Sequence, residues 1–476
     1  MQMSFPFSAR SSRPLAVAAL SVAILGALAA PEHARASAFQ LKEDSAKAMG
    51  RAYAGQSTAG GDVSVVADNP AAMTDLKGTY FQADVTAINF GAQFSGSAHD
   101  AMGRPISGGD GGDAGTTMPV PSLFFATQVS DRWHLGAAFT APFGFQTEYN
   151  RNWVGRYNAI KSKFQSLDAT LSASFDVTDN FSIGGSVIAQ KTSAELTSAV
   201  NFNAVGQGLV QQALGAGALT PAQAGPLSQQ LAAVIPPGSD GFARIKADDW
   251  AYGWQLGGYW KLSPNDKLDF NYRAKIEHRL EGTANYQVPA NVQALLPTVG
   301  ALLGTSNLPF THTNGAADFD TPAVASASYW HQAERFGLGI DVAWTEWSSF
   351  KNLNIEYQNP AQPETTQVFN WRNSWYVSIG GDYYLTDKLT LRGGIGVDST
   401  PTYAATRDAR VPDSTRKLAS VGMGYKASEH FEINVSYAHI FVNNAHIDAA
   451  SATGDVLSGN YDDYGNLLAL SAQYKF

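Results

Sequence analysis

The 476-residue sequence contains no cysteine, so it can form neither a disulfide scaffold nor a cysteine-ligated zinc or iron–sulfur site. Charge is also scarce, because only 15% of the residues are charged against about 25% in an average globular domain. The formal net charge of -9 argues against nucleic-acid binding, which favours basic domains. An aromatic content of 11% is too high for a disordered chain. A large soluble domain or an outer-membrane β-barrel remains.

Long apolar runs are absent except near the N-terminus, which argues against a helical membrane protein. The one run, 15–30, follows Arg10 and Arg13 and precedes Ala34-Arg35-Ala36, a small-x-small cleavage pattern. This order predicts a cleaved signal peptide over residues 1–36 and therefore an exported protein. The alternative is a transmembrane anchor, but the run is shorter than the roughly 20 residues that a spanning helix needs.

The rest of the chain alternates with a period of two residues. In 336–345, 389–397 and 431–437, bulky apolar residues alternate with small or polar ones. Successive side chains of a strand point to opposite faces, so each segment has one apolar face and one polar face. Glycine, alanine, serine, threonine and asparagine fill the polar face, with few of the lysines and glutamates typical of solvated strands. This pattern favours a barrel with lipid outside and a polar lumen over a soluble sandwich.

Short and long connections between the predicted strands alternate, which is typical of an outer-membrane barrel with short periplasmic turns and long outer loops. The six short turns lie at 130–132, 178–180, 263–266, 331–334, 386–388 and 427–430. The long connections lie at about 95–117, 150–163, 198–246, 288–311, 358–370, 400–415 and 443–462. Six turns join twelve strands and one strand at each end makes fourteen, with sixteen as the alternative. We therefore predict an all-β fold, a 14-stranded antiparallel transmembrane β-barrel over residues 78–476.

The C-terminal residues alternate in the same way, and the chain stops at an aromatic residue. Leu468, Leu470, Ala472, Tyr474 and Phe476 occupy every second position. A last strand that ends in an aromatic residue resembles the assembly signal of bacterial outer-membrane proteins. We therefore expect the barrel assembly machinery and outer-membrane lipid as partners.

Residues 37–77 do not alternate and are expected to form short helices and turns. About forty residues cannot bury a core of their own. The segment must pack against something, and the lumen of the barrel is the available cavity.

Several blocks lie in order along the mature chain: Ala38-Phe39-Gln40-Leu41, 50–55, Asn69-Pro70-Ala71, 144–149, 344–350 and 371–375. Together these blocks resemble the FadL family of outer-membrane transporters for long-chain fatty acids and other hydrophobic compounds. The resemblance implies a fourteen-stranded barrel plugged by an N-terminal hatch, here residues 37–77. It also implies capture of the substrate by outer loops, an inner pocket near the hatch, and sideways exit through the wall, without nucleotide or covalent chemistry.

The resemblance suggests three groups of transport residues. Asn69, Pro70 and Ala71 would hold the hatch against the wall near the third strand. Pro142, Phe143 and Gly144 interrupt that strand where the family has its lateral opening; proline lacks a ladder donor and glycine permits a bulge, although a mere edge irregularity is the alternative. Phe39, Arg372 and Asp398 are the expected substrate-binding residues. Phe39 is otherwise a packing aromatic, and Arg372 with Asp398 otherwise an ion pair that braces the barrel.

The predicted function is passive uptake of long-chain fatty acids or similar hydrophobic compounds across the outer membrane of a bacterium. We expect a monomer without nucleic-acid partner, cofactor, metal or catalytic residues. Gly55-Gln56-Ser57-Thr58-Ala59 is an imperfect nucleophile elbow, and 108–113 resembles a single calcium-binding repeat, which we interpret as a flexible outer loop. The alternative functions are a general porin and a structural or adhesive barrel.

Overall fold

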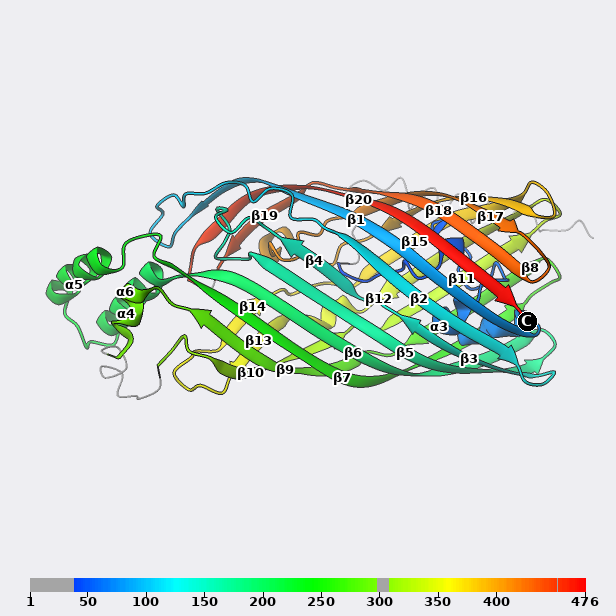
Figure 1. Ribbon diagram of the computed structural model, residues 1–476, viewed down its shortest axis with the longest axis horizontal. Coiled ribbons are helices and arrows are strands. Elements are labelled where there is room, and N and C mark those ends of the chain that lie inside the picture. Colours follow the sequence, from blue (N-terminus) through cyan, green and yellow to red (C-terminus); the bar gives the residue numbers. More distant parts are fainter. Residues whose placement is uncertain (1–37, 298–307, 452) are drawn as a thin grey trace, which may run out of the picture. The chain divides into compact units, whose positions relative to one another are not determined.

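The computed structural model describes residues 38–297, 308–451 and 453–476, so the predicted signal peptide lies outside the described residues. In these ranges, twenty strand segments form one antiparallel sheet (Figure 1). The segments are β1 (Thr79–His99), β2 (Thr117–Gln128), β3 (Trp133–Thr140), β4 (Gly144–Glu148), β5 (Lys161–Thr178), β6 (Phe181–Asn201), β7 (Asp240–Lys261), β8 (Asp266–Arg273), β9 (Ile276–Gln287), β10 (Thr313–Thr321), β11 (Val324–Gln332), β12 (Phe336–Thr345), β13 (Asn352–Tyr357), β14 (Thr365–Val368), β15 (Ser374–Tyr384), β16 (Leu389–Asp398), β17 (Arg416–Lys426), β18 (Phe431–Val442), β19 (Ala445–Ala450) and β20 (Val456–Lys475).

The described segments combine into fourteen barrel strands, because six barrel strands consist of two consecutive segments each. These pairs are β3 with β4, β8 with β9, β10 with β11, β12 with β13, β14 with β15, and β18 with β19. The first and last strands close the barrel, with β1 paired to β20 from Tyr80–Lys475 to His99–Val456. The predicted fold class is confirmed, and so is the strand count.

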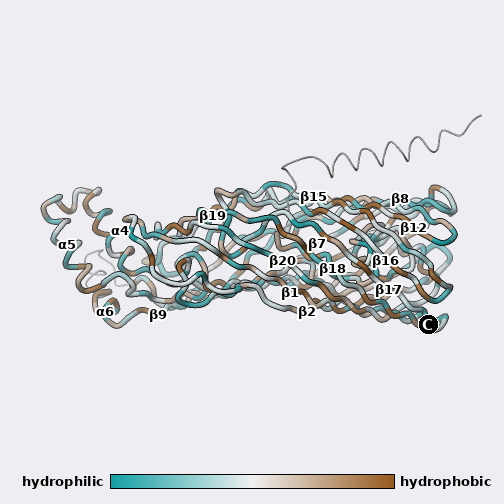
Figure 2. The backbone as a smooth tube through the Cα atoms, turned by 90° about the horizontal axis from the view of Figure 1, so that it is seen from above, coloured by the Kyte–Doolittle hydropathy of each residue, from teal (hydrophilic) through white to brown (hydrophobic). Residues whose placement is uncertain are grey.

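The period-two pattern sets which side chains face out of the barrel. On β12 the bulky residues Phe336 and Leu338 are exposed, while the small residues between them are buried. In Figure 2 the strands carry hydrophobic stretches, whereas the loops at the end near the C-terminus are largely hydrophilic. An apolar outer surface between polar ends is the arrangement that a bilayer stabilises.

Each of the six predicted short turns joins two strands, from β2–β3 to β17–β18. The strands run further into the long connections than predicted: β6 and β7 stay paired up to Asn201 and Asp240, and 443–462 contains β19 and the start of β20. These extensions lie beyond the lipid, where both faces of a strand tolerate polar residues. The alternation that marks a lipid-facing strand is therefore weak there.

Residues 38–77, which we call the N-terminal segment, contain three short helices: α2 (Ala46–Met49), α3 (Val65–Asp68) and η1 (Pro70–Asp75). The helix α2 contacts β1, β17, β18 and β20, whereas η1 contacts β3, β5, β6 and β7. A segment that contacts strands on opposite sides of a closed barrel lies inside it, as the dark blue trace in Figure 1 shows.

Two buried ion pairs fix the N-terminal segment to the wall. The guanidinium of Arg51 lies 3.3 Å from a carboxylate oxygen of Asp382 on β15, and the ammonium of Lys47 lies 3.0 Å from Glu432 on β18. Breaking one partner of such a pair leaves an uncompensated charge in a buried site, which is strongly destabilising. The pairs therefore hold the segment in one position.

The remaining helices lie in the connections: α4 (Phe202–Gly215), α5 (Pro221–Val234), α6 (Ala290–Gln293), η2 (Trp347–Ser349) and η3 (Ala404–Thr406). The helices α4 and α5 lie in the 198–246 connection, and Figure 1 shows them with α6 at one end of the barrel. None of the helices in the described ranges is long and apolar enough to cross a membrane.

Candidate functional site

The motif Asn69-Pro70-Ala71 attaches the N-terminal segment to three strands. Asn69 begins η1: its side-chain oxygen accepts from the Ala71 N–H at 3.1 Å, and its amide donates to Asp269 on β8 at 3.0 Å. Glycines allow this close contact, because a Cβ at Gly257 would lie 1.9 Å from Asn69 Oδ1 and one at Gly184 2.3 Å from the Ala71 nitrogen. These contacts lie on β6, β7 and β8, whereas other residues of the segment bind the interrupted third strand.

The third strand is interrupted at the predicted residues. Regular pairing stops after Thr140 at the end of β3 and resumes with Gly144 at the start of β4. The start of the N-terminal segment takes up the freed backbone groups: the Leu41 N–H donates to the Pro142 carbonyl at 2.8 Å, and the Gly144 N–H donates to the Phe39 carbonyl at 2.9 Å. Phe39 to Leu41 thus act as a short inner strand behind the interruption.

Hydrogen bonding between β2 and the third strand also stops at this point. Within the described residues, the β2–β3 ladder ends at the pair Leu123–Phe139, and no ladder joins β2 to β4. A backbone bond from the Glu148 N–H to the Ala114 carbonyl connects the edges again further along. We call the interval between 117–122 of β2 and 144–147 of β4 the ladder gap.

Two prolines of β2 that the sequence analysis did not single out lie on the edge of the ladder gap. The N–H of Val129 points to the third strand and that of Gln128 to β1, so odd-numbered residues of β2 face the third strand. Pro119 and Pro121 occupy odd positions and have no N–H. The edge therefore lacks two donors that would otherwise be unpaired inside a bilayer, where each costs several kcal/mol.

Phe39 lies at the centre of a cluster of aromatic rings. Its ring centroid lies between 4.7 and 6.4 Å from six other rings, and its side chain is buried. The partners come from the interruption with the adjoining β4, from β5, from β10, and from the segments that follow β12 and β14. They are Phe143, Phe145, Phe164, Phe319, Trp347 and Trp371.

A cavity of about 100 Å³, which we call the apolar cavity, lies between this cluster and the ladder gap. Met118 of β2 and Phe145 of β4 line it from the two edges of the gap. Its other apolar lining comes from Phe39, Leu41, Ile88, Phe90, Val411 and Ile440. It can therefore hold an alkyl or aromatic group directly behind the unpaired part of the wall.

Two guanidinium groups, those of Arg410 and Arg416, border the apolar cavity. The sequence analysis identified neither of them. Arg416 is paired with Asp413 at 2.8 Å, and Asp413 also accepts from the Ala38 N–H. Arg410 forms no salt bridge within the described residues; it donates to the Ser162 hydroxyl at 3.1 Å and the Thr197 carbonyl at 3.4 Å. Burial lowers the pKa of Arg410. A carboxylate in the cavity would compensate its charge.

Arg372 and Asp398 do not line the apolar cavity. The Arg372 guanidinium donates to the carbonyls of Thr400 and Thr402 and lies over the Tyr403 ring. Asp398 lies opposite Tyr376 and Arg416 in the strand register. The sequence carried no signal for Arg410, because its position depends on a loop that folds back into the lumen.

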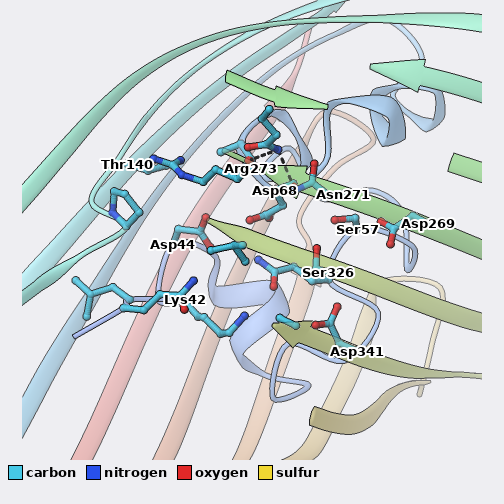
Figure 3. Close-up of a pocket in the computed structure, with 18 of the residues that line it drawn as sticks. Lys42, Asp44, Ser57, Asp68, Thr140, Asp269, Asn271, Arg273, Ser326 and Asp341 are labelled. Carbon is cyan, nitrogen blue, oxygen red and sulfur yellow. Dashed lines mark hydrogen bonds between the residues drawn. The ribbon is translucent and has the colours of Figure 1, made fainter. Parts of the chain in front are cut away.

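A second cavity, of about 110 Å³, lies on the other side of the interruption and is polar. Figure 3 shows the carboxyl groups of Asp44, Asp68 and Asp341 around it, with Lys42 and Arg273. Burial raises the pKa of Asp68 to about 6. The interruption thus separates an apolar cavity from a polar one.

An apolar track leads from the outer helices to Phe39 along inward faces of five neighbouring strands. The Phe39 cluster includes Leu280, and Ala194, Ala247 and Leu353 pack against that cluster. At the other end, Tyr357 lies beside Tyr286, whose ring is followed by those of Phe310 and Phe202 at the start of α4. The track is lined by Ala194, Leu196, Ile245, Ala247, Leu280, Ala284, Ala317, Leu353, Ile355 and Tyr357. A water-filled lumen would be polar here.

Both carboxylates of the glycine-rich loop at 108–113 accept hydrogen bonds from backbone N–H groups. Asp110 accepts from the Gly112 N–H and Asp113 from the N–H groups of Ala92 and Gly115, so both carboxylates bind backbone. No group of three or more His, Asp or Glu residues in the described ranges is placed to hold a metal ion.

Comparison with known proteins agrees with this geometry. The family described as "Outer membrane protein transport protein (OMPP1/FadL/TodX)" matches residues 27–476. The chain belongs to this family. The resemblance stated from the sequence is confirmed, and the protein is an outer-membrane β-barrel of a family that transports hydrophobic compounds.

Individual relatives span nearly the whole chain. The long-chain fatty acid transport protein of Escherichia coli O6:H1 is 26% identical over 84% of this chain and 86% of its own. Outer membrane protein P1 of Haemophilus influenzae is 26% identical over 93% of this chain and 96% of its own. The crystal structure of a Pseudomonas aeruginosa FadL homologue is similar with a TM-score of 0.82 and 31% identity, covering 92% of this chain and all of that chain. The Pseudomonas putida toluene transporter TodX, at 17% identity and a TM-score of 0.62, shares the fold.

Proposed function

We propose that this protein takes up long-chain fatty acids across the outer membrane by passive diffusion. The observation that carries the proposal is the continuous apolar surface inside the barrel. It runs from the outer helices along the apolar track to the Phe39 cluster and the apolar cavity, and it ends at the ladder gap.

The driving force is the affinity of the tail for apolar surface, about 0.8 kcal/mol for each buried methylene. A chain of apolar sites lets the substrate move without crossing open water. The N-terminal segment acts as a plug, the hatch of residues 37–77, which closes the lumen to water and supplies Phe39 to the substrate pocket. Asn69, Pro70 and Ala71 hold this plug to the wall.

The substrate leaves sideways beside Pro142, Phe143 and Gly144, through the ladder gap. The polar cavity below the interruption supports this route. A hydrocarbon tail gains nothing among the polar side chains of Asp44, Asp68 and Asp341. The lipid beyond the gap offers the tail an apolar environment.

Arg410 favours a fatty acid over a neutral hydrocarbon. Its half-buried guanidinium lies at the apolar cavity without a carboxylate in a salt bridge within the described residues, so a carboxylate head group gains a charge-assisted hydrogen bond there. The name of the Escherichia coli relative supports the same substrate class. An aromatic hydrocarbon, as the name of TodX suggests for that protein, would use the apolar cavity without Arg410.

The test is uptake of labelled oleate and labelled toluene by cells in which this chain is the only member of the family. We expect oleate uptake, with apparent affinity reduced about tenfold by Arg410→Gln, the effect of losing one charge-assisted contact. Arg104→Gln, at an exposed pair with Asp100, is the control that leaves uptake unchanged.

Three other results would each redirect the proposal. Uptake of toluene alone, unaffected by Arg410→Gln, would identify a hydrocarbon transporter. Loss of affinity with Arg372→Gln instead would place the head group at the residue that the family resemblance suggested. A folded barrel that conducts small ions steadily and takes up neither compound would be a general porin.

A further inference from the structure

The outward face of β7 changes from aromatic to charged at Trp250. The outward side chains of Trp250, Tyr252 and Trp254 are 54%, 80% and 47% exposed. The next outward residues towards the loops are Asp248, Lys246 and Arg244. Aromatic side chains gather where hydrocarbon meets water, so the charged residues lie at the level of lipid head groups on the side of the long loops.

Cations gather at this level on three neighbouring strands. In the register of β5, β6 and β7, Lys163 and Lys246 lie on either side of Glu195, and Lys161 and Arg244 on either side of Thr197. Residues opposite one another share a face, and adjacent strands are about 5 Å apart. We call Lys161, Lys163, Lys191, Arg244 and Lys246 the basic cluster.

A groove of about 630 Å³ lies on the same outward face beside the basic cluster. Arg151, Lys161 and Arg244 line it, and the Arg151 guanidinium lies 5.0 Å from the centre of the Phe242 ring. Asn285 and Gln287 of β9 supply amide groups to the lining. Asn285 lies opposite Arg244 in the register, so these side chains also face outwards.

The cations here are not neutralised by their neighbours. Arg151 and the basic cluster make six positive charges, against four outward carboxylates: Glu148, Glu195 and Asp248, which pair with them, and Glu281, which lies opposite Asp248 in the register. Arg244 and Lys246 share one of these, and Lys163 has no salt bridge within the described part of the chain. On β9, by contrast, Arg279 is paired with both Asp318 and Glu356. The local excess is notable in a chain with a net charge of -9.

We propose that this groove binds the phosphorylated sugar head group of a glycolipid in the outer leaflet. The guanidinium and ammonium groups bind the phosphates, and the amides of Asn285 and Gln287 bind sugar hydroxyls. Acyl chains cover the apolar outward side chains of the same strands, including Leu171, Val187 and Leu256, which are 63%, 64% and 58% exposed. A soluble phosphate compound has no acyl chains and would leave these apolar side chains uncovered.

Native mass spectrometry of the full-length protein with purified lipopolysaccharide tests the site. The double variant Lys161→Gln with Arg244→Gln should bind lipopolysaccharide at least about tenfold more weakly, since two charge-assisted contacts are lost. The matched control is Lys275→Gln with Arg279→Gln, which removes two outward cations that already have acidic partners. Heat-modifiable gel mobility confirms that both variants fold.

Dephosphorylated lipopolysaccharide should bind as weakly to the unmodified protein as lipopolysaccharide does to the double variant. The proposal is overturned if the two double variants bind lipopolysaccharide equally, or if dephosphorylation has no effect. It is also overturned if inorganic pyrophosphate alone binds with the affinity of the lipid, which would indicate a soluble ligand. None of these readouts depends on transport. Oleate uptake by the double variant should stay normal, because Lys161 and Arg244 line neither the apolar cavity nor the apolar track.

Discussion

Pro119 and Pro121 mark the part of β2 whose backbone is not hydrogen-bonded to the third strand. Proline is confined to positions in a sheet where no donor is needed. Both prolines stand where an N–H would face the third strand, opposite the segment in which Pro142 also lacks a donor. Three missing donors make an unpaired stretch tolerable inside a bilayer.

Restoring the donors should narrow the ladder gap. In a Pro119→Ala, Pro121→Ala variant, the two new N–H groups face the third strand and cost several kcal/mol each unless they find acceptors there. We expect these amides to become protected from hydrogen exchange and oleate uptake to fall several-fold. Val120→Ala, at a residue whose N–H faces β1, is the control; fast exchange at 119 and 121 with normal uptake would contradict the prediction.

Asn69 uses both ends of its amide, one to begin η1 and one to bind Asp269 on the wall. Asn69→Ala leaves buried groups without partners, at about 1–3 kcal/mol each. The N-terminal segment should loosen, so that single-channel recordings show openings while oleate uptake falls. Asn89→Ala removes only an exposed bond to Thr117, at 2.9 Å, and should behave like the unmodified protein. Unchanged recordings for Asn69→Ala would rule out a role in holding the plug.

At the scale of elements, the N-terminal segment and the third strand depend on one another. Phe39 to Leu41 satisfy the backbone groups that the interruption exposes, and the interruption provides the space into which Phe143 and Phe145 turn towards Phe39. Each feature thus supplies hydrogen-bond partners to the other, which an open strand edge inside the wall needs.

Deleting residues 38–77 tests this dependence. The barrel strands pair only with one another across most of the sheet, so the variant should still show heat-modifiable mobility. Without the segment, planar bilayer recordings should show a much larger conductance, because nothing then fills the lumen between the strands that it contacts. A deletion variant with the conductance of the full chain would show that the segment is not the plug.

At the scale of the whole molecule, the barrel was predictable because its physical cause is local and repeated. Alternation along each strand and six short turns were enough to reach fourteen strands, as 336–345 illustrates. The interruption between Thr140 and Gly144 was predictable for the same reason, since the effects of proline and glycine on strand pairing are local. The ends of β6 and β7 were not predictable, because residues outside the bilayer need not alternate between apolar and polar.

The site was predictable only in part, because it depends on contacts between distant segments. Phe39 was singled out from the sequence, but its contacts with six rings from five regions of the chain were not predicted. Arg410 lies at the apolar cavity only because the 407–413 loop folds into the lumen, while Arg372 binds carbonyls elsewhere. The role of Pro119 and Pro121 can be recognised only from the strand register, which shows that an N–H at either position would point into the ladder gap.

Exit through the ladder gap is the central claim, and a reversible cross-link across it is the most direct test. The chain has no cysteine, so Met118→Cys with Phe145→Cys introduces the only thiols, one on each edge of the gap. A reducible thiol-to-thiol linker between them should abolish oleate uptake, and a reductant should restore it. The same linker between Phe125→Cys and Ala137→Cys, where β2 and β3 are already paired, should have no effect. If the cross-linked protein takes up oleate as fast as it does after the reductant has cleaved the linker, the account is contradicted, because the substrate then leaves by another route.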